Sequence, residues 1–150
     1  MNNLKKILEN FEKRFDALLI NQRTKKLKEG CYVYELEADT TIPSEYIMLM
    51  HYVGEIDIKL QNKMVNYISS KQNNEGGWPL FFKGDTDLSA SVKAYYALKL
   101  SGLNENSSQM TKARKCIIQL GGIEKVNAFT RISLAIFGQI TWSSIPYMPI

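Results

Sequence analysis

The chain has 150 residues, of which 45% are hydrophobic and 23% are charged, a composition typical of one globular domain with a packed core. These proportions exclude a disordered, collagenous or coiled-coil chain. Two cysteines, Cys31 and Cys116, are too few for a disulfide-stapled secreted scaffold and too far apart in sequence for a close metal-ligand pair. A reducing, cytosolic setting fits this cysteine usage best, and we expect neither a metal nor a cofactor.

The basic surplus belongs to the start of the chain. The net charge is +4, yet residues 1–30 hold eight basic and four acidic residues, whereas residues 31–150 hold eleven of each. Such a segment could meet an anionic lipid surface or a nucleic acid. A solvated helix face is favoured, and nucleic acid is not expected, because the bases are mixed with acids and lack interleaved aromatic residues.

Helical spacing of apolar residues dominates the chain, and long strand-like alternation is absent. The first helix lies within residues 1–30. The second follows Pro43 and ends at Gly54, and we expect it to be deeply buried because it is apolar nearly all round. Four further helices are predicted from the same spacing and from cap residues. Their approximate bounds are Asp57 to Lys71, Asp87 to Ser101, Ser108 (as N-cap) to Leu120, and Phe129 to Gly138.

A weak internal repeat accompanies these helices. Gln22 and Gln72 each close a helix, and each is followed by glycine and then an aromatic residue, Tyr32 in the first case and Trp78 in the second. Helical hairpins of this kind cannot bury a face alone and must stack. An open solenoid and a closed α/α barrel both satisfy that requirement.

The segment that follows the third helix, residues 71–78, combines Gln72, two glycines and a large aromatic residue. Gly76 and Gly77 permit a tight reversal of the backbone. Trp78 can then fold back on the Gln72 amide, while this amide bonds a free backbone group at a neighbouring helix end. From the residues alone, the segment is predicted to be a hairpin turn held by the side chains of Gln72 and Trp78.

This turn resembles the repeated Gln-Trp motif of the class II triterpene cyclases, most closely that of the bacterial squalene-hopene cyclases. Ordered matches extend along nearly the whole chain and comprise residues 36–46, 87–99, 121–124, 129–131, Trp142, Pro146 and Pro149. The resemblance implies an all-α fold of helical-hairpin repeats. Residues 31–150 would be the first part of the N-terminal α/α barrel, incomplete here, and residues 1–30 a leading amphipathic helix that packs in the family on the catalytic barrel.

The resemblance also bears on the chemistry. The family's initiating acid is an Asp-x-Asp-Asp motif, which these 150 residues do not contain. The nearest match, Asp85-Thr86-Asp87, is followed by Leu88 where the motif has a third aspartate. Asp87 is therefore predicted to be the N-cap of the next helix. Glu45 matches the family's glutamate near a water network at the deprotonation end of the cavity. A first-turn carboxylate favoured by the helix dipole is the alternative. His51 has no partner at ligand spacing and is predicted to be a core or boundary histidine.

The resemblance therefore implies an N-terminal fragment of a cyclase that converts squalene to hopene or hopanol, inactive alone. The alternatives are a non-catalytic subunit that completes a split cyclase, and a degraded remnant. Expected partners are squalene, once the missing region is present, and a second copy or a separately encoded remainder. The expected location is the bacterial cytoplasm, with peripheral contact on the inner face of the membrane. An incomplete barrel should also leave inner-facing side chains uncovered, namely Tyr46, Met50, Tyr95, Tyr96 and Phe129.

Overall fold

The structure is a computed structural model that describes residues 2–24 and 37–147. The chain divides into two compact units, Met1–Glu37 and Ala38–Ile150. The first unit contains α1 (Asn2–Thr24). Its described side chains include Phe11 and Phe15, whose rings stack with centroids 6.2 Å apart and which are exposed within this unit. The proposed first repeat falls outside the described residues, as Gly30, Tyr32 and the side chain of Gln22 do.

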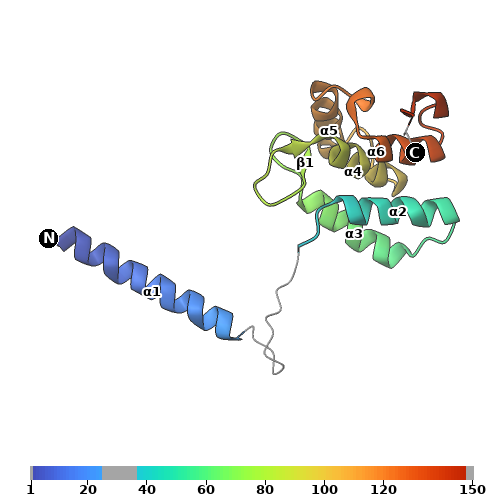
Figure 1. Ribbon diagram of the computed structural model, residues 1–150. Coiled ribbons are helices and arrows are strands. Elements are labelled where there is room, and N and C mark those ends of the chain that lie inside the picture. The colour runs from blue at the N-terminus through green and yellow to red at the C-terminus, as the bar shows by residue number, and fades with distance from the viewer. Residues whose placement is uncertain (1, 25–36, 148–150) are drawn as a thin grey trace. The chain divides into compact units, whose positions relative to one another are not determined.

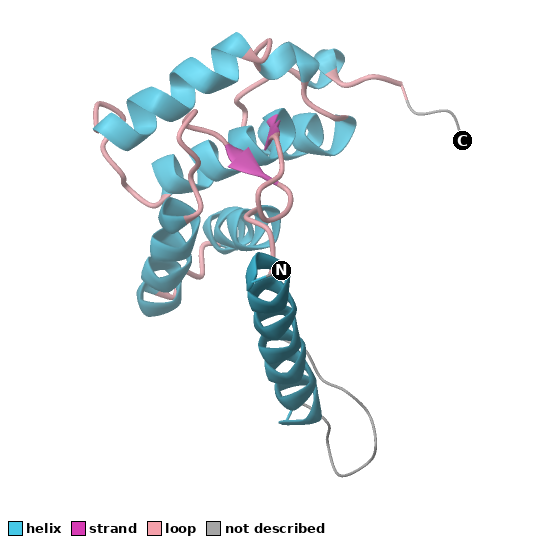
Figure 2. Cartoon of the chain, turned by 90° about the vertical axis from the view of Figure 1, so that its left-hand side faces the viewer, coloured by secondary structure: helices cyan, strands magenta, loops and turns pink. Residues whose placement is uncertain are grey.

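The second unit is built almost entirely of helices, which confirms the all-α prediction (Figures 1 and 2). Its helices and strands, in chain order, are α2 (Thr41–Val53), α3 (Ile58–Ser70), β1 (Trp78–Pro79), β2 (Thr86–Asp87), α4 (Leu88–Leu100), α5 (Ser108–Gln119) and α6 (Ala128–Ile136). Two 3-10 helices, Ile123–Lys125 and Trp142–Ser144, flank α6. The strands pair antiparallel, Trp78 with Asp87 and Pro79 with Thr86, and at two residues each they are too short for strand periodicity to predict.

Four helices of this unit begin at a polar side chain that accepts a hydrogen bond from a backbone N–H three residues further on. These N-cap residues are Asp57 for α3, Asp87 for α4, Ser107 for α5 and Asn127 for α6. The prediction of Ser108 as N-cap was therefore wrong by one residue. Ser107 is extended (φ −62°, ψ 153°), so its hydroxyl reaches the N–H of Met110, whereas Ser108 is already the first helical residue.

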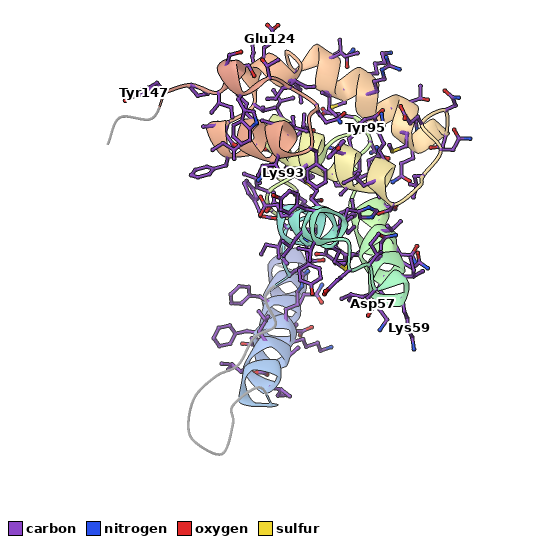
Figure 3. The ribbon with its side chains drawn as sticks, turned by 90° about the vertical axis from the view of Figure 1, so that its right-hand side faces the viewer. Asp57, Lys59, Lys93, Tyr95, Glu124 and Tyr147 are labelled. Carbon is purple, nitrogen blue, oxygen red and sulfur yellow. The ribbon has the colours of Figure 1, made fainter. Side chains whose placement is uncertain are left out.

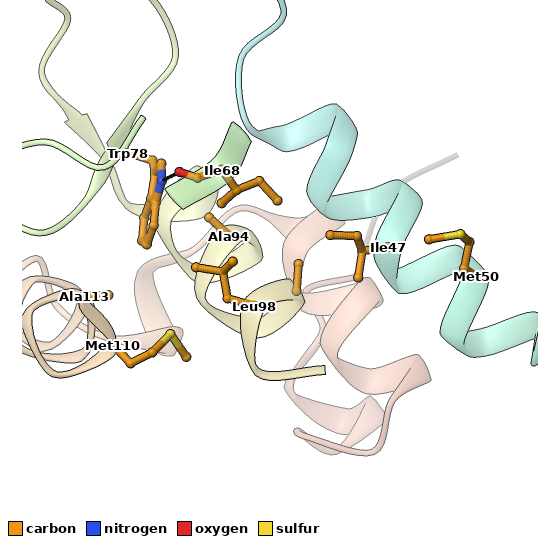
Figure 4. Close-up of a cluster of buried hydrophobic side chains, with 9 residues drawn as sticks. Ile47, Met50, Ile68, Trp78, Ala94, Leu98, Met110 and Ala113 are labelled. Atoms are coloured by element: carbon orange, nitrogen blue, oxygen red, sulfur yellow. Dashed lines mark hydrogen bonds between the residues drawn. The ribbon is translucent and has the colours of Figure 1, made fainter. Parts of the chain in front are cut away.

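Helix α4 lies at the centre of the second unit and packs against α2, α3, α5 and α6. One buried cluster joins four of these helices with Trp78, as Figure 4 shows. Its members are Ile47, Met50, Ile68, Trp78, Ala94, Ala97, Leu98, Met110 and Ala113. A second cluster continues towards α6 and includes Tyr96, Ile117 and Leu134. Both clusters use α4, so its side chains are the most extensively buried of any helix here.

Helix α2 is buried on one face only, and the prediction of deep burial was wrong. Its buried side chains are Ser44, Ile47, Met48 and Met50. The opposite face is apolar yet exposed, at Ile42, Tyr46, Leu49 and Val53, which we call the α2 stripe. These residues follow the spacing of one helix face, because successive members are four, three and four positions apart. Apolar composition therefore marks two faces of α2, of which the described helices cover one.

Only some of the inner-facing residues that were predicted to be uncovered are exposed. Phe129 is 69% exposed and Tyr46 is 47% exposed, whereas Met50 and Tyr96 are buried inside the two clusters. Leu120, the predicted last residue of the fifth helix, lies just after α5 ends at Gln119 and is 38% exposed. Within the part of the chain that the structure describes, no helix is both long and apolar enough to cross a bilayer.

Candidate functional site

The turn after α3 is held by the side chain of Gln72. Its amide nitrogen donates to the carbonyl oxygen of Gly76, at 2.8 Å, and to that of Gln109, at 3.1 Å, in the first turn of α5. Gln109 returns a longer bond of 3.4 Å from its own amide to the carbonyl of Ser69. The two glutamines therefore tie the end of α3 to the start of α5.

Trp78 occupies the centre of the same turn and is fully buried. Its indole N–H donates to the carbonyl oxygen of Ile68 in the last turn of α3, at 2.8 Å (Figure 4). Its backbone N–H donates to the hydroxyl of Ser91 on α4, at 2.9 Å. The group that reaches the carbonyl at the end of a helix is thus the indole of Trp78. The amide of Gln72 instead bonds the turn itself and the first turn of α5.

Gly76 and Gly77 serve the turn for different reasons. Gly76 has φ of 93°, and a Cβ there would lie 2.7 Å from backbone atoms of Lys112 on α5. A Cβ on Gly77 would lie 2.2 Å from the Thr86 methyl group. Asn73 completes the turn, since its side chain accepts from the Gly77 N–H and donates to the Thr86 hydroxyl. Two independent steric limits therefore require glycine in succession.

Of the two aspartates that precede α4, Asp85 and Asp87, the second has a structural role. Oδ1 of Asp87 accepts from the N–H of Ala90 at 2.7 Å, which confirms the predicted N-cap. His51 is also in a structural position: its Nε2 lies 2.7 Å from Oε1 of the buried Gln61, so the ring bridges α2 and α3. Among the described residues, no cluster of three or more histidine, cysteine, aspartate or glutamate side chains could hold a metal.

Glu45 lines a groove of about 330 Å³ between α2 and α6. The walls are mostly apolar, with Leu49 and Tyr52 from α2 and Phe129 and Phe137 from the α6 side. Of the described residues that line this groove, only Glu45 is charged. It is the fifth residue of α2, beyond the first turn to which the helix-dipole interpretation assigned it. We call this feature the α2/α6 groove.

A lysine that sequence reasoning did not single out meets this glutamate. Nζ of Lys93, on α4, lies 2.5 Å from Oε1 of Glu45. The lysine side chain is 10% exposed and the glutamate side chain is 50% exposed. The pair spans 48 positions in sequence, so only the packing of α2 on α4 brings the two groups together.

Arg131 was also missed as a structural residue. One guanidinium nitrogen, Nη1, donates to the carbonyl of Ser144 at 2.9 Å, and Nη2 donates to the carbonyl of Glu124. Its Nε is buried and has no hydrogen-bond partner among the described residues. Arg131 thus ties α6 to the 3-10 helix before it and to the 3-10 helix after it. A single basic residue inside a helix gave no signal of these contacts.

A second cavity, of about 650 Å³, lies among α4, α5, the 3-10 helix at 123–125 and α6. Its lining includes Tyr95, Tyr96 and Ile117, with Lys99, Arg114 and Glu124 as charged residues. Burial raises the pKa of Tyr96 above its ordinary value, and the positive charge of Lys99 partly opposes that rise. Glu45 and Lys93 do not line this cavity.

Comparison with known proteins gives a family for the chain. The family model for the squalene-hopene cyclase N-terminal domain matches residues 13–150. A squalene-hopene cyclase of Zymomonas mobilis is 48% identical over 127 residues, which cover 84% of this chain and 19% of that protein. A squalene-hopene cyclase of Schizosaccharomyces japonicus is 42% identical over 137 residues, covering 91% of this chain and 20% of that protein.

A more distant relative is a dammaradiene synthase of Dryopteris crassirhizoma, 35% identical over 137 residues, which cover 91% of this chain and 20% of that protein. The chain thus spans about a fifth of the length of the curated relatives it matches. The match includes the turn of Gln72 and Trp78, the central helix α4 and the α2/α6 groove. The chain belongs to the squalene-hopene cyclase N-terminal domain family.

Proposed function

We propose that this chain supplies the first part of the N-terminal α/α barrel of a squalene-hopene-type cyclase, and that its α2/α6 groove faces hydrocarbon near the end of the cyclisation. The observation that carries this proposal is the groove itself, in which one carboxylate, Glu45, stands among apolar and aromatic side chains of the described chain. Family membership over residues 13–150 supports it.

The chemistry of polyene cyclisation makes such a groove useful. A strong acid protonates a terminal alkene, aromatic faces stabilise the successive cations, and a base or water ends the cascade. Tyr52, Phe129 and Phe137 supply aromatic surface, and Glu45 supplies an acceptor for the last proton. In that step a C–H bond next to the final cation breaks, its electron pair becomes the alkene bond, and the proton passes to Glu45 or to water bound by it.

These 150 residues do not supply the acid that starts the cyclisation. The sequence of 150 residues contains no Asp-x-Asp-Asp motif, and Asp87 is committed to the N-cap of α4. We therefore propose that the chain alone does not cyclise squalene. Purified chain given squalene in detergent is expected to yield no hopene and no hopanol above a boiled control, and any cyclised product above that control contradicts this part of the proposal.

A chimera tests whether this chain can supply the N-terminal part of an active cyclase. Residues 1–150 replace the matching N-terminal fifth of the Zymomonas mobilis relative, and the remaining four-fifths of that relative are kept. We expect this chimera to convert squalene to cyclised product, while the remaining four-fifths alone does not. A folded chimera that gives no product, beside an active intact relative, overturns the proposed function.

The α2 stripe favours one alternative arrangement, in which the chain is a separate subunit that completes a split cyclase. Exposed apolar residues that share a helix face are typical of a surface that another protein covers. Mixing the purified chain with the separately purified remainder of the Zymomonas mobilis relative tests this version. Product formed in trans supports a subunit, and product formed only by the fused chimera supports a continuous cyclase chain.

A further inference from the structure

The pair of Lys93 and Glu45 is asymmetric in its exposure. Lys93 belongs to the central helix α4 (Figure 3), and its side chain is nearly covered. The side chain of Glu45, which lines the α2/α6 groove, is half exposed. Lysine is almost never fully buried unless it is paired, because an ammonium without water or a partner is costly. Lys93 therefore depends on Glu45 for a partner, and it holds one oxygen of the glutamate carboxylate.

Only one oxygen of the glutamate is taken. The hydrogen bond of 2.5 Å goes to Oε1, and among the described residues Oε2 has no hydrogen-bond donor. A carboxylate oxygen that accepts no hydrogen bond from the protein can accept a proton or bind a water molecule. A freely rotating glutamate on an exposed helix face would spend part of its time turned into solvent.

A second lysine on the same helix provides the contrast. Lys99 pairs with Glu105 at 2.9 Å, but both side chains are more than two-fifths exposed. Exposed pairs of this kind contribute little to stability or geometry, because water screens them. A pair with one buried partner resists separation, because breaking it leaves a charge without water or a counter-ion.

We infer that Lys93 is a positioning residue, which clamps Oε1 of Glu45 and so keeps Oε2 available to the α2/α6 groove for the terminating proton transfer. This inference rests on the proposed function. It adds that termination depends on a lysine outside the groove lining, acting through Glu45. Loss of the lysine charge should then lower deprotonation relative to capture of the final cation by water, without abolishing cyclisation.

The test uses the chimera with the substitutions Lys93→Met, Lys93→Arg, Glu45→Gln and, as a matched control, Lys99→Met. Methionine keeps most of the aliphatic stem of lysine and removes the charge. We expect Lys93→Met to lower the ratio of alkene to alcohol product about threefold or more, in the same direction as Glu45→Gln. Lys93→Arg should restore most of the parental ratio, and Lys99→Met should keep it.

The outcomes separate this inference from the proposed function. A parental chimera without product overturns the proposed function, and an active chimera in which Lys93→Met keeps the parental product ratio overturns the inference alone. A double-mutant cycle in the purified 150-residue chain gives a second measurement that needs no activity. We expect Lys93→Met and Glu45→Gln to be coupled by about fivefold in the unfolding equilibrium constant, and additive effects overturn the clamp.

Discussion

The indole N–H of Trp78 donates a hydrogen bond of 2.8 Å to the carbonyl oxygen of Ile68, and both side chains are fully buried. The last carbonyls of a helix have no partner within the helix, so a donor from the following turn satisfies one of them. One side chain thus closes the end of α3 and fills the core between α3, α4 and α5.

Replacing this tryptophan should be costly. Trp78→Ala is expected to lower the free energy of unfolding by about 3 kcal/mol or more, because it empties a core site and removes the bond to Ile68. Trp78→Phe, which keeps a ring but loses the N–H donor, should cost less. Denaturant unfolding followed by circular dichroism measures both variants. An unchanged midpoint for Trp78→Ala contradicts the central place of this side chain.

The two left-handed glycines Gly76 and Gly102 allow a controlled comparison. Both have positive φ, 93° and 88°, but a Cβ at Gly102 meets no atom within 4 Å, whereas one at Gly76 meets the Lys112 backbone at 2.7 Å. Gly102→Ala should cost about 1 kcal/mol for backbone strain alone. Gly76→Ala should cost at least twice as much. Equal losses in thermal or urea unfolding would mean that α5 shifts freely away from the turn.

Cys116 gives the chain a dependence of stability on pH. Burial raises the pKa of this thiol above its ordinary value of 9.0, and the negative charge of Glu75 adds to the rise. The folded chain therefore keeps the proton at pH values where the unfolded chain loses it. The contribution of the thiol to stability is complete below about pH 9 and is lost as pH rises further.

The measurement compares two variants, Cys31→Ser and Cys31→Ser with Cys116→Ala. We expect the free energy of unfolding to fall more steeply between pH 8 and pH 10 in the first variant, which keeps the buried thiol. In the same variant, alkylation of Cys116 at pH 8 should be slow until urea is added. Parallel pH profiles, together with rapid alkylation of the native chain, contradict this expectation.

The α2 stripe should make the isolated chain associate. We expect the purified chain to bind a hydrophobic dye and to sediment above its monomer mass, because the exposed stripe gains by leaving water. Leu49→Lys should weaken both effects. Phe82→Lys is the control, since Phe82 is 80% exposed but lies outside the stripe. A clean monomer with negligible dye binding would contradict an unsatisfied surface on α2.

The N-terminal segment should prefer anionic membranes. Residues 1–30 carry eight basic and four acidic residues, and the side chains of Phe11, Phe15 and Leu18 are exposed along one face of α1. Phosphatidylglycerol vesicles should therefore retain more chain than phosphatidylcholine vesicles, with the difference lost in high salt. Phe11→Ser with Phe15→Ser should reduce retention. Equal retention by both vesicle types counts against peripheral contact through this helix.

The helices were predictable because their signals are local. Asp57, Asp87 and Gly54 mark helix ends through bonds or backbone angles within a few residues of themselves, and all three predictions agree with the structure. The turn at Gln72 and Trp78 was recognisable for the same reason. Its detailed bonding was not, because the partners of Gln72 include a carbonyl 37 positions away.

The exposure of α2 could not be predicted from its sequence. Periodicity identifies apolar faces, but it does not say which face another element covers, and a helix with two apolar faces gives the same pattern in either case. The pairing of Lys93 with Glu45 has a related cause. The residues around Lys93 in the sequence of α4 are mostly apolar, so the sequence shows no partner for its charge. The packing of α2 on α4 brings Glu45 to it.

The side-chain hydrogen bonds from Gln72 to the carbonyl of Gln109, and from Gln109 to the carbonyl of Ser69, have a consequence for how neighbouring helical hairpins are aligned. Apolar contacts have no directional preference, and volume-conserving exchanges among core side chains cost little, so they define the alignment of two helices less sharply than hydrogen bonds do. Hydrogen bonds from Gln72 to a carbonyl of α5, and from Gln109 to a carbonyl of α3, are directional and would both break after a slip of one residue. The register of one hairpin against the next is therefore fixed by directional polar contacts at its end as well as by the packing of the core.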